Sequence, residues 1–442
     1  MTVASLLSRW LARPLGRTSV MSLVIRLAGL TLGFLQAILC ARLLGVEGYG
    51  TFALSLAVAQ IAATFALLGL HNLAVCRVAE LLANRASSEA RRFAGRALGI
   101  ATVAGLALSG LLAIAAVALA QWLEPYDAAL LAAAMLIVPV TLMLLLRGLT
   151  QGAGAIIGAQ LPGDVLRPAL FCLALLGVSA TGAMLTPTYA LLLLAAAFAV
   201  AAVVAAAWCR FAMPPGEAEA PACSDFRLLP AAAPFLGLSL GTIAMAEAAT
   251  LLLALFAEPS DVGIYQPAAR LLVLMTVPVQ AAAMAFAPRV AELNARGEAE
   301  AVGALTRRFT LATTAGTTIV SLPIALTAPW LLALFGDEFA LAAPLVWIFA
   351  ATQILNAASG PVGYLMTMTG RPGSSLRAQI AGLAVILAGG TVLVSLYGAG
   401  GAALATALGI LVWNGALLRV VRRELGFDPS LVSAFRRPAG AA

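Results

Sequence analysis

Three charged side chains lie deep inside long apolar stretches of the sequence: Arg26, Glu247 and Arg270. A charge is costly in hydrocarbon unless it faces a partner or a water-filled cavity, so each of the three is a candidate functional residue. Glu247 and Arg270 flank a turn near residue 259, within roughly 3 Å of equal depth at about 1.5 Å per helical residue. Two roles stay open for them, a static ion pair and a cation-coupling site.

Arg26 has no acidic residue at a similar depth in any predicted span. Its planar guanidinium can hold an anion, such as a pyrophosphate or an acidic sugar, through two parallel hydrogen bonds. The alternative is that the long side chain reaches back to the nearer membrane surface. Arg42, close to Glu47 at the other end of the same stretch, is interpreted as an interfacial anchor.

Other chemistry is disfavoured by the residue types. His71 is the single histidine, and the five cysteines contain no Cys-x-x-Cys spacing, so we expect neither a metal site nor a disulfide framework. All 26 basic residues are arginines, which excludes the lysine of a phosphate-binding loop and ATP hydrolysis by that route. No carboxylate pair shares a face within a span. The sequence therefore predicts a protein that is not an enzyme and has no cofactor.

The elements that position these residues are predicted to be membrane-spanning helices. Of the 442 residues 62% are hydrophobic and 10% are charged, and the mean hydropathy is +1.01, which excludes a soluble globular protein. A span needs about 20 apolar residues. The predicted spans are 18–43, 50–71, 97–123, 128–147, 166–185, 187–209, 228–256, 262–286, 308–328, 341–363, 378–397 and 400–419.

The arginines predict the orientation. With twelve spans, 23 of the 26 arginines fall at the N-terminus, in alternate loops and in the C-terminal tail, all on one side. Positive residues are retained in the cytoplasm, so both termini are predicted to be cytoplasmic. The basic balance indicates membrane anchoring, with no nucleic-acid partner. Ser5–Arg17 is either a short interfacial helix or a basic leader.

An internal repeat relates the two halves of the chain. A shift of 213 residues superposes most spans and places Glu47-Gly48-Tyr49-Gly50-Thr51-Phe52 against Ser260-Asp261-Val262-Gly263-Ile264-Tyr265, while residues 152–160 resemble residues 370–379. Six helices per half insert in the same orientation, which predicts two parallel six-helix bundles around a central cavity, although duplication also builds channels and scaffolds. The predicted parts are a basic N-terminus 1–17, lobes 18–209 and 228–423, a linker 210–227 and a tail 424–442.

The stretch 228–256 carries the residues most able to bend a helix. Pro234 lies inside it, followed by Gly237 and Gly241. Proline removes a backbone hydrogen bond and glycine adds freedom, so these three residues are a candidate hinge.

The motifs at the span ends resemble those of the polysaccharide and O-antigen flippases, a family of the multidrug/oligosaccharidyl-lipid/polysaccharide exporter superfamily. The matching segments are Ala41-Arg42-Leu43-Leu44-Gly45-Val46-Glu47-Gly48-Tyr49-Gly50-Thr51-Phe52-Ala53, Asp261-Val262-Gly263-Ile264-Tyr265 with Ala268-Ala269-Arg270, Leu334-Phe335-Gly336-Asp337-Glu338-Phe339, and Met368-Thr369-Gly370.

The resemblance implies a multi-pass protein of the bacterial inner membrane that moves an undecaprenyl-diphosphate-linked oligosaccharide to the outer leaflet by alternating access. It implies substrate binding by Arg26 and Arg270 and coupling of a proton or sodium ion at Glu247. Membrane lipids and a polysaccharide polymerase are the expected partners. Twelve spans and one deep arginine in the first span argue against a role in flipping the peptidoglycan precursor.

Two alternatives are kept. One is a cation-coupled multidrug exporter of the same superfamily. Such relatives carry carboxylates in the N-terminal lobe, and no acidic residue lies within a predicted span of residues 18–209, which argues against this role. The other alternative is a non-transporting scaffold of an envelope synthesis complex.

Overall fold

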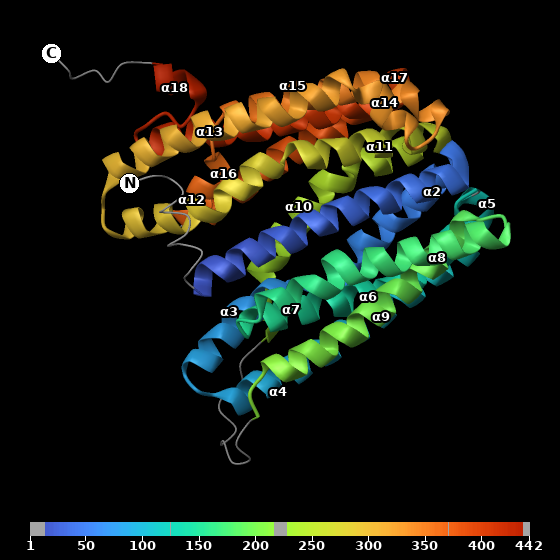
Figure 1. Ribbon diagram of the computed structural model, residues 1–442, viewed down its shortest axis with the longest axis horizontal. Coiled ribbons are helices and arrows are strands. Elements are labelled where there is room, and N and C mark those ends of the chain that lie inside the picture. The colour runs from blue at the N-terminus through green and yellow to red at the C-terminus, as the bar shows by residue number, and fades with distance from the viewer. Residues whose placement is uncertain (1–13, 124, 216–227, 370, 436–442) are drawn as a thin grey trace. The chain divides into compact units, whose positions relative to one another are not determined.

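The computed structural model describes residues 14–123, 125–215, 228–369 and 371–435. Most of the predicted N-terminal segment 1–17, including most of Ser5–Arg17, lies outside these residues. Residues 216–227 of the predicted linker and 436–442 of the predicted tail lie outside them as well. All secondary structure in the described part of the chain is helical (Figure 1).

Helices succeed one another with short connections along the first half of the chain. They are α2 (Pro14–Ala66), α3 (Leu70–Ala83), α4 (Ser87–Ala118), α5 (Ala120–Leu123), α6 (Asp127–Gly152), α7 (Ile156–Leu161), the π-helix η1 (Pro162–Leu166), α8 (Arg167–Thr181) and α9 (Pro187–Ala212).

Helices also make up the second half of the chain. Its elements are α10 (Leu228–Phe256), α11 (Pro259–Met275), α12 (Val277–Ala295), α13 (Ala299–Leu326), α14 (Ala328–Ala333), the 3₁₀-helix η2 (Asp337–Ala342), α15 (Ala343–Ala358), α16 (Val362–Met368), α17 (Pro372–Glu424) and α18 (Leu431–Phe435).

Ten helical segments of the described chain are long and apolar enough to cross a membrane. Two of them are double, because α2 turns at Gly45 (φ 69°) and α17 turns at Gly398 (φ 51°). A positive φ is inexpensive only for glycine, so each glycine lets one long helix become two. Every predicted span overlaps one of the ten segments. The protein is therefore a multi-pass membrane protein whose described residues are helical and form about ten to twelve candidate spans.

The fifth predicted span begins later than the helix does. We placed it at 166–185, whereas α7, η1 and α8 form one helical run over Ile156–Thr181. Pro162-Gly163 suggests a loop, but the fixed φ of proline is compatible with a helix. The run includes Asp164, so the expectation that no acidic residue lies within a span of residues 18–209 is wrong.

Contacts divide the chain into two compact units, Met1–Ile243 and Ala244–Ala442. The division lies inside α10, because the first part of this helix packs within the N-terminal unit. Leu228 and Ala232 of α10 belong to the same buried cluster as residues of α3, α4 and α6. The lobe boundary at 210–227 stays a prediction.

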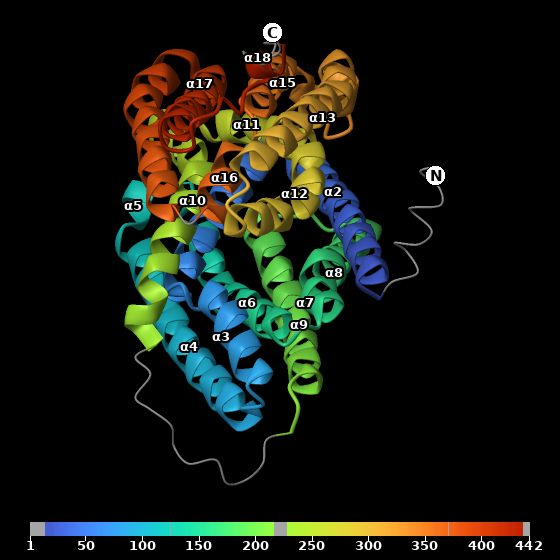
Figure 2. The same cartoon turned by 90° about the vertical axis from the view of Figure 1, so that its left-hand side faces the viewer.

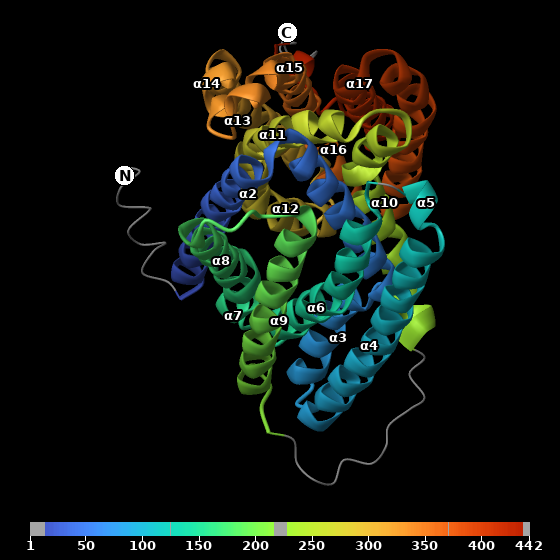
Figure 3. The same ribbon diagram turned by 90° about the vertical axis from the view of Figure 1, so that its right-hand side faces the viewer.

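In the N-terminal unit, α6 lies against α3, α4 and α9 (Figures 2 and 3). Small residues permit these close approaches. A Cβ atom at Gly148 of α6 would lie 2.5 Å from the carbonyl oxygen of His71 in α3. The Nδ1 atom of His71 is in turn 2.7 Å from the carbonyl oxygen of Leu144. The single histidine therefore joins two helices by a hydrogen bond.

In the C-terminal unit, α15 packs against both α13 and α17. The turn of α17 is held by a residue of the sequence motif, since the Asp261 carboxylate accepts the backbone N–H of Ala399 at 3.0 Å. Tyr265, four residues later, is buried against Phe349 with ring centroids 5.9 Å apart. The motif around Asp261 thus has a structural role at a helix turn.

Candidate functional site

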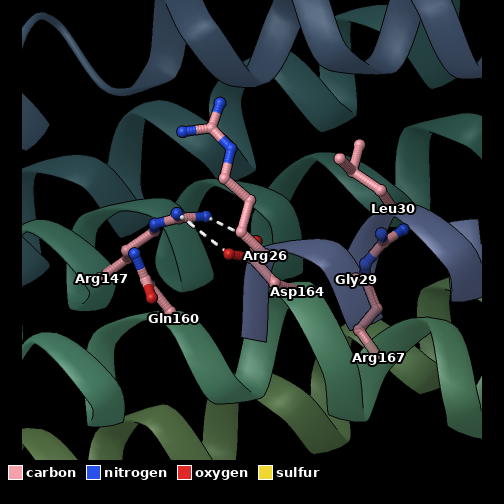
Figure 4. A pocket seen from close by; sticks show the side chains of 7 residues that line it. All are labelled: Arg26, Gly29, Leu30, Arg147, Gln160, Asp164 and Arg167. Carbon is pink, nitrogen blue, oxygen red and sulfur yellow. Dashed lines mark hydrogen bonds and ion pairs between the residues drawn. The ribbon is translucent and has the colours of Figure 1, made fainter. Parts of the chain in front are cut away.

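A polar cavity of about 350 Å³ lies within the N-terminal unit. Its walls come from α2, α6, α7, η1 and α8, and Figure 4 shows the side chains around it. The lining residues are Arg26, Gly29, Leu30, Arg147, Gln160, Asp164 and Arg167. Arg26, which we predicted as a substrate contact, therefore lies in the wall of the same cavity as two further arginines and one carboxylate.

The π turn η1 brings the charged residues of this cavity together. The backbone N–H of Arg167 bonds to the carbonyl of Pro162, five residues earlier, instead of four. Pro168 follows directly and has no N–H to donate. The carbonyl of Gly163 is consequently satisfied by a side chain, since Arg167 Nε donates to it at 3.2 Å. π turns are rare in proteins, and those that occur often lie at functional sites.

Asp164 forms a two-point ion pair with Arg147 of α6. Arg147 Nη1 donates to Asp164 Oδ1 at 2.8 Å, and Nη2 donates to Oδ2 at 3.2 Å. The side chains are 31% and 24% exposed, respectively. This planar, two-point contact is the arrangement that guanidinium groups also make with phosphate.

The other two polar side chains of the α7–α8 run are fixed by separate contacts. The guanidinium of Arg167 lies 4.8 Å from the centre of the Phe198 ring in α9, a cation–π contact. Gln160 accepts a hydrogen bond at 2.8 Å from the hydroxyl of Ser22 in α2. Both side chains are thus held in place at the wall of the cavity.

Close helix packing sets the position of Arg26 relative to Asp164. Gly29 lies on α2, three residues after Arg26, and a Cβ atom there would lie 2.6 Å from the backbone oxygen of Asp164. Only glycine permits this approach of α2 to η1. The crossing therefore puts Arg26 beside the Arg147–Asp164 pair (Figure 4).

The charges of the cavity lining do not balance. Three guanidinium groups and one carboxylate leave a formal charge of about +2. Positive charge in a concave, partly dehydrated site attracts anions, and guanidinium groups bind carboxylates and phosphates best. The cavity is thus suited to a doubly charged anion.

A second group of polar side chains lies in the C-terminal unit, around the predicted Glu247. Glu247 of α10 interacts electrostatically with Arg270 of α11, although no ion pair within 4.0 Å joins these two described residues. Close by, Gln266 Nε2 donates to the hydroxyl of Thr250 at 3.0 Å. The structure therefore keeps Glu247 and Arg270 in one unit without a direct salt bridge.

The predicted hinge residues lie within one continuous helix. Pro234, Gly237 and Gly241 all fall inside α10. The same helix contributes to both compact units.

Sequence reasoning missed Asp164, Arg147 and Arg167 as site residues. Arg147 and Arg167 lie at the ends of two predicted spans, where the orientation rule explains them, and Asp164 lies in the connection between these spans. One signal was available, because Asp164 and Arg167 are the only charged residues between 148 and 209. An isolated acid and base in so apolar a segment indicate a buried polar site.

Comparison with solved structures shows which fold this chain has. A multidrug resistance transporter of the MATE family and MOP superfamily, in an inward-facing conformation, has a TM-score of 0.72 and 16% identity, over 92% of this chain and 98% of that one. The lipid II flippase MurJ has a TM-score of 0.67 and 12% identity, over 91% of this chain and 87% of that one. A MOP-superfamily transporter from Pyrococcus furiosus has a TM-score of 0.61 and 16% identity, over 92% of this chain and 94% of that one. The fold of this chain is therefore MATE-like.

The family follows from the sequence match. The model of the polysaccharide biosynthesis protein family matches residues 15–294. The chain belongs to this family. Comparison with curated protein sequences found no match.

Proposed function

We propose that the protein flips an undecaprenyl-diphosphate-linked oligosaccharide from the inner to the outer leaflet of the bacterial inner membrane. The observation that carries this proposal is the cavity in which Arg26 lies with Arg147 and Arg167. A diphosphate is doubly charged or more, and an excess of guanidinium groups is the complement that it needs. Family membership in polysaccharide biosynthesis supports the same cargo.

Transport would proceed by alternating access. We propose twelve spans in two parallel six-helix lobes, 18–209 and 228–423, with both termini cytoplasmic. The lipid tail would stay in the bilayer while the headgroup crosses a central cavity between states. Bending at Pro234, Gly237 and Gly241 would accompany the switch between these states. A polymerase would take the oligosaccharide at the outer surface.

Coupling is assigned to Glu247. A carboxylate at membrane depth can bind a proton or sodium ion, and binding would favour one of the two facing states. Arg270 would act as an anion contact in the same unit and would modulate the charge of Glu247. A static Glu247–Arg270 pair remains the competing role, and Glu247→Gln separates the two. Loss of the dependence of transport on an ion gradient, with the protein still folded, supports coupling.

The function is tested by reconstituting the purified protein alone in liposomes with a fluorescent undecaprenyl-diphosphate oligosaccharide in the inner leaflet. We expect headgroup appearance outside, and a decrease of tenfold or more in the initial rate for Arg26→Gln. The matched control is Arg210→Gln, which removes an arginine from the last turn of α9, outside the cavity lining. Absence of translocation by the unaltered protein would contradict the proposal and would favour a scaffold role.

A second candidate function is a cation-coupled multidrug exporter. Asp164 supports it, because it is a carboxylate inside a span of the N-terminal half. Its two hydrogen bonds to Arg147 weigh against it, since a paired carboxylate has less charge to offer a cation. Efflux of a cationic dye by cells that express the protein, with unchanged surface polysaccharide, would favour the exporter.

A further inference from the structure

We infer that the Asp164 carboxylate occupies the place of a phosphate group, and that the substrate's diphosphate displaces it from Arg147. Arg147 and Arg167 would then bind the substrate together with Arg26. This inference rests on the proposed function and adds to it two binding residues and an internal competitor. Nothing in the sequence motifs assigns a role to any of the three residues Arg147, Asp164 and Arg167.

The first argument is the geometry of the pair. Asp164 offers its two carboxylate oxygens to the two Nη atoms of Arg147, at 2.8 and 3.2 Å. Two oxygens of a phosphate group present nearly the same spacing to a guanidinium. An anion that enters the cavity can therefore make the same two hydrogen bonds once the carboxylate has rotated away.

The second argument is the cost of opening the pair. Both side chains are partly buried, at 31% and 24% exposure, and an ion pair that still contacts solvent is less costly to open than a fully buried one. A released carboxylate would face a wet cavity, so it would not be stranded in an apolar core. Exchange of one anion for another is thus inexpensive at this position.

The third argument is that the backbone around Asp164 need not move. Its carbonyl is held against Gly29 and the neighbouring Gly163 carbonyl is held by Arg167 Nε. Arg167 is fixed in addition by the Phe198 ring. Only side-chain rotation at Asp164 is required, and the other arginine of the run is already in place. Prearranged donors bind an anion with little loss of conformational entropy.

The charge of Asp164 determines whether its substitution should strengthen or weaken anion binding. With Asp164 ionised the lining carries about +2, and with asparagine at this position it would carry about +3. Asparagine keeps the shape and one acceptor oxygen but does not compete as an anion. If Asp164 is a competitor, removal of its charge strengthens anion binding. If it only positions Arg147, the same substitution weakens binding.

The experiment measures the affinity of inorganic pyrophosphate for the full chain in nanodiscs of phosphatidylcholine, by calorimetry in magnesium-free buffer. We expect Asp164→Asn to bind about tenfold more tightly than the unaltered protein and Arg147→Gln and Arg167→Gln about tenfold more weakly. Asp164→Glu, which keeps the charge, and Arg210→Gln should bind as the unaltered protein does. Thermal unfolding of each variant establishes that it is folded.

Weaker binding by Asp164→Asn, matching that of Arg147→Gln, would overturn the inference and would make Asp164 a positioning residue. Equal affinities for all variants would also overturn it. The source of the anion is decided by competition, with undecaprenyl diphosphate expected to displace pyrophosphate. Displacement by phosphatidylglycerol at the same concentration would overturn the assignment to a diphosphate.

The outcome is separable from that of the proposed function. If liposomes show no translocation while the affinities keep the expected order, the proposed function is lost and the anion site remains. If translocation is normal and the affinities of Arg147→Gln and Asp164→Asn are unchanged, the anion site is lost and the proposed function remains.

Discussion

Two segments that resemble each other in sequence differ in structure. Gln160 of α7 aligns with Gln379 of α17, and the same offset places Asp164 against Leu383 and Arg167 against Ile386. In the first segment the backbone makes a π turn and the charged side chains line a cavity. In the second segment the α-helix is regular and Ile386 is 1% exposed.

The paired glycines show the same divergence. A Cβ atom at Gly163 would meet the flexible end of Met143, at 3.1 Å. A Cβ atom at the aligned Gly382 would meet the carbonyl of Gly409 at 2.8 Å and the Trp413 side chain at 3.0 Å. One copy has thus kept room for polar side chains, and the other has closed into tight helix packing.

The amides complete the comparison. Gln160 Oε1 accepts a hydrogen bond from Ser22, whereas Gln379 Oε1 is buried and has no partner among the described residues. A buried acceptor without a partner is unfavourable, so the amide oxygen of Gln379 does not stabilise the second segment as that of Gln160 stabilises the first. Asp164 and Arg167 therefore line a polar cavity, whereas the aligned positions Leu383 and Ile386 are apolar.

The largest expected change in stability concerns the segment around Gly382. Gly382→Ala should lower the free energy of unfolding by about 3 kcal/mol, because its methyl group would push against the backbone of Gly409. Gly163→Ala should change it by less than about 1 kcal/mol, since Met143 can shift and alanine favours helix. Unfolding midpoints in detergent check both. Equal losses in the two variants would show that the two copies are packed alike.

The next effect concerns the crossing that builds the cavity. Gly29→Ala should lower stability by about 2 kcal/mol and reduce pyrophosphate affinity, because the methyl group would push η1 away from α2. Gly33→Ala is the matched control, as its Cβ atom would have no neighbour within 4 Å. Calorimetry and thermal unfolding of the pair provide the measurement. Unchanged affinity in Gly29→Ala would separate the crossing from the site.

The smallest effect concerns an ion pair of the other unit, outside the spans. Burial raises the pKa of the Asp428 carboxyl, but hydrogen bonds from the Ser430 backbone N–H at 3.0 Å and from Arg422 at 2.7 Å outweigh it, so the pKa is lowered. A lowered folded-state pKa contributes stability above the ordinary value of about 3.9, and this is lost as the pH falls through the folded-state value. Asp428→Asn should therefore lose about 0.5 kcal/mol at pH 7 and nothing near pH 2.

A double-variant cycle with Arg422→Gln checks the origin of that effect. The double variant should be no less stable than either single variant, because both remove the same pair. Additive losses at pH 7, or a loss for Asp428→Asn that persists at low pH, would assign the effect to something other than the ion pair.

Much of the fold follows from apolar length alone. Each predicted span overlaps a helical segment, and the two double segments turn at Gly45 and Gly398, which carry positive φ. Arg26 could also be chosen from the sequence, since a charge surrounded by apolar residues needs a reason to be there. These inferences depend only on local composition, which the sequence displays directly.

The rest of the cavity could not be predicted, because it depends on contacts between segments. Arg147 and Asp164 are 17 residues apart, on different helices. Their pairing requires the tight turn after α6 and the π turn at Pro162, neither of which composition determines. The rule that assigns loop arginines to the cytoplasmic side accounts for Arg147 and Arg167 without an interaction partner. It therefore gives no reason to expect that these residues line a cavity.

The π turn changes the orientation of α8 about its own axis. A helix advances about 100° per residue, so a turn that takes one residue more than usual rotates the rest of α8 by about that angle. Phe171 and Leu175 face the protein interior in this orientation, each with 0% exposure. Without the wider turn the same sequence would present a different side to its neighbours. The phase of an entire helix is thus set by five residues at its start.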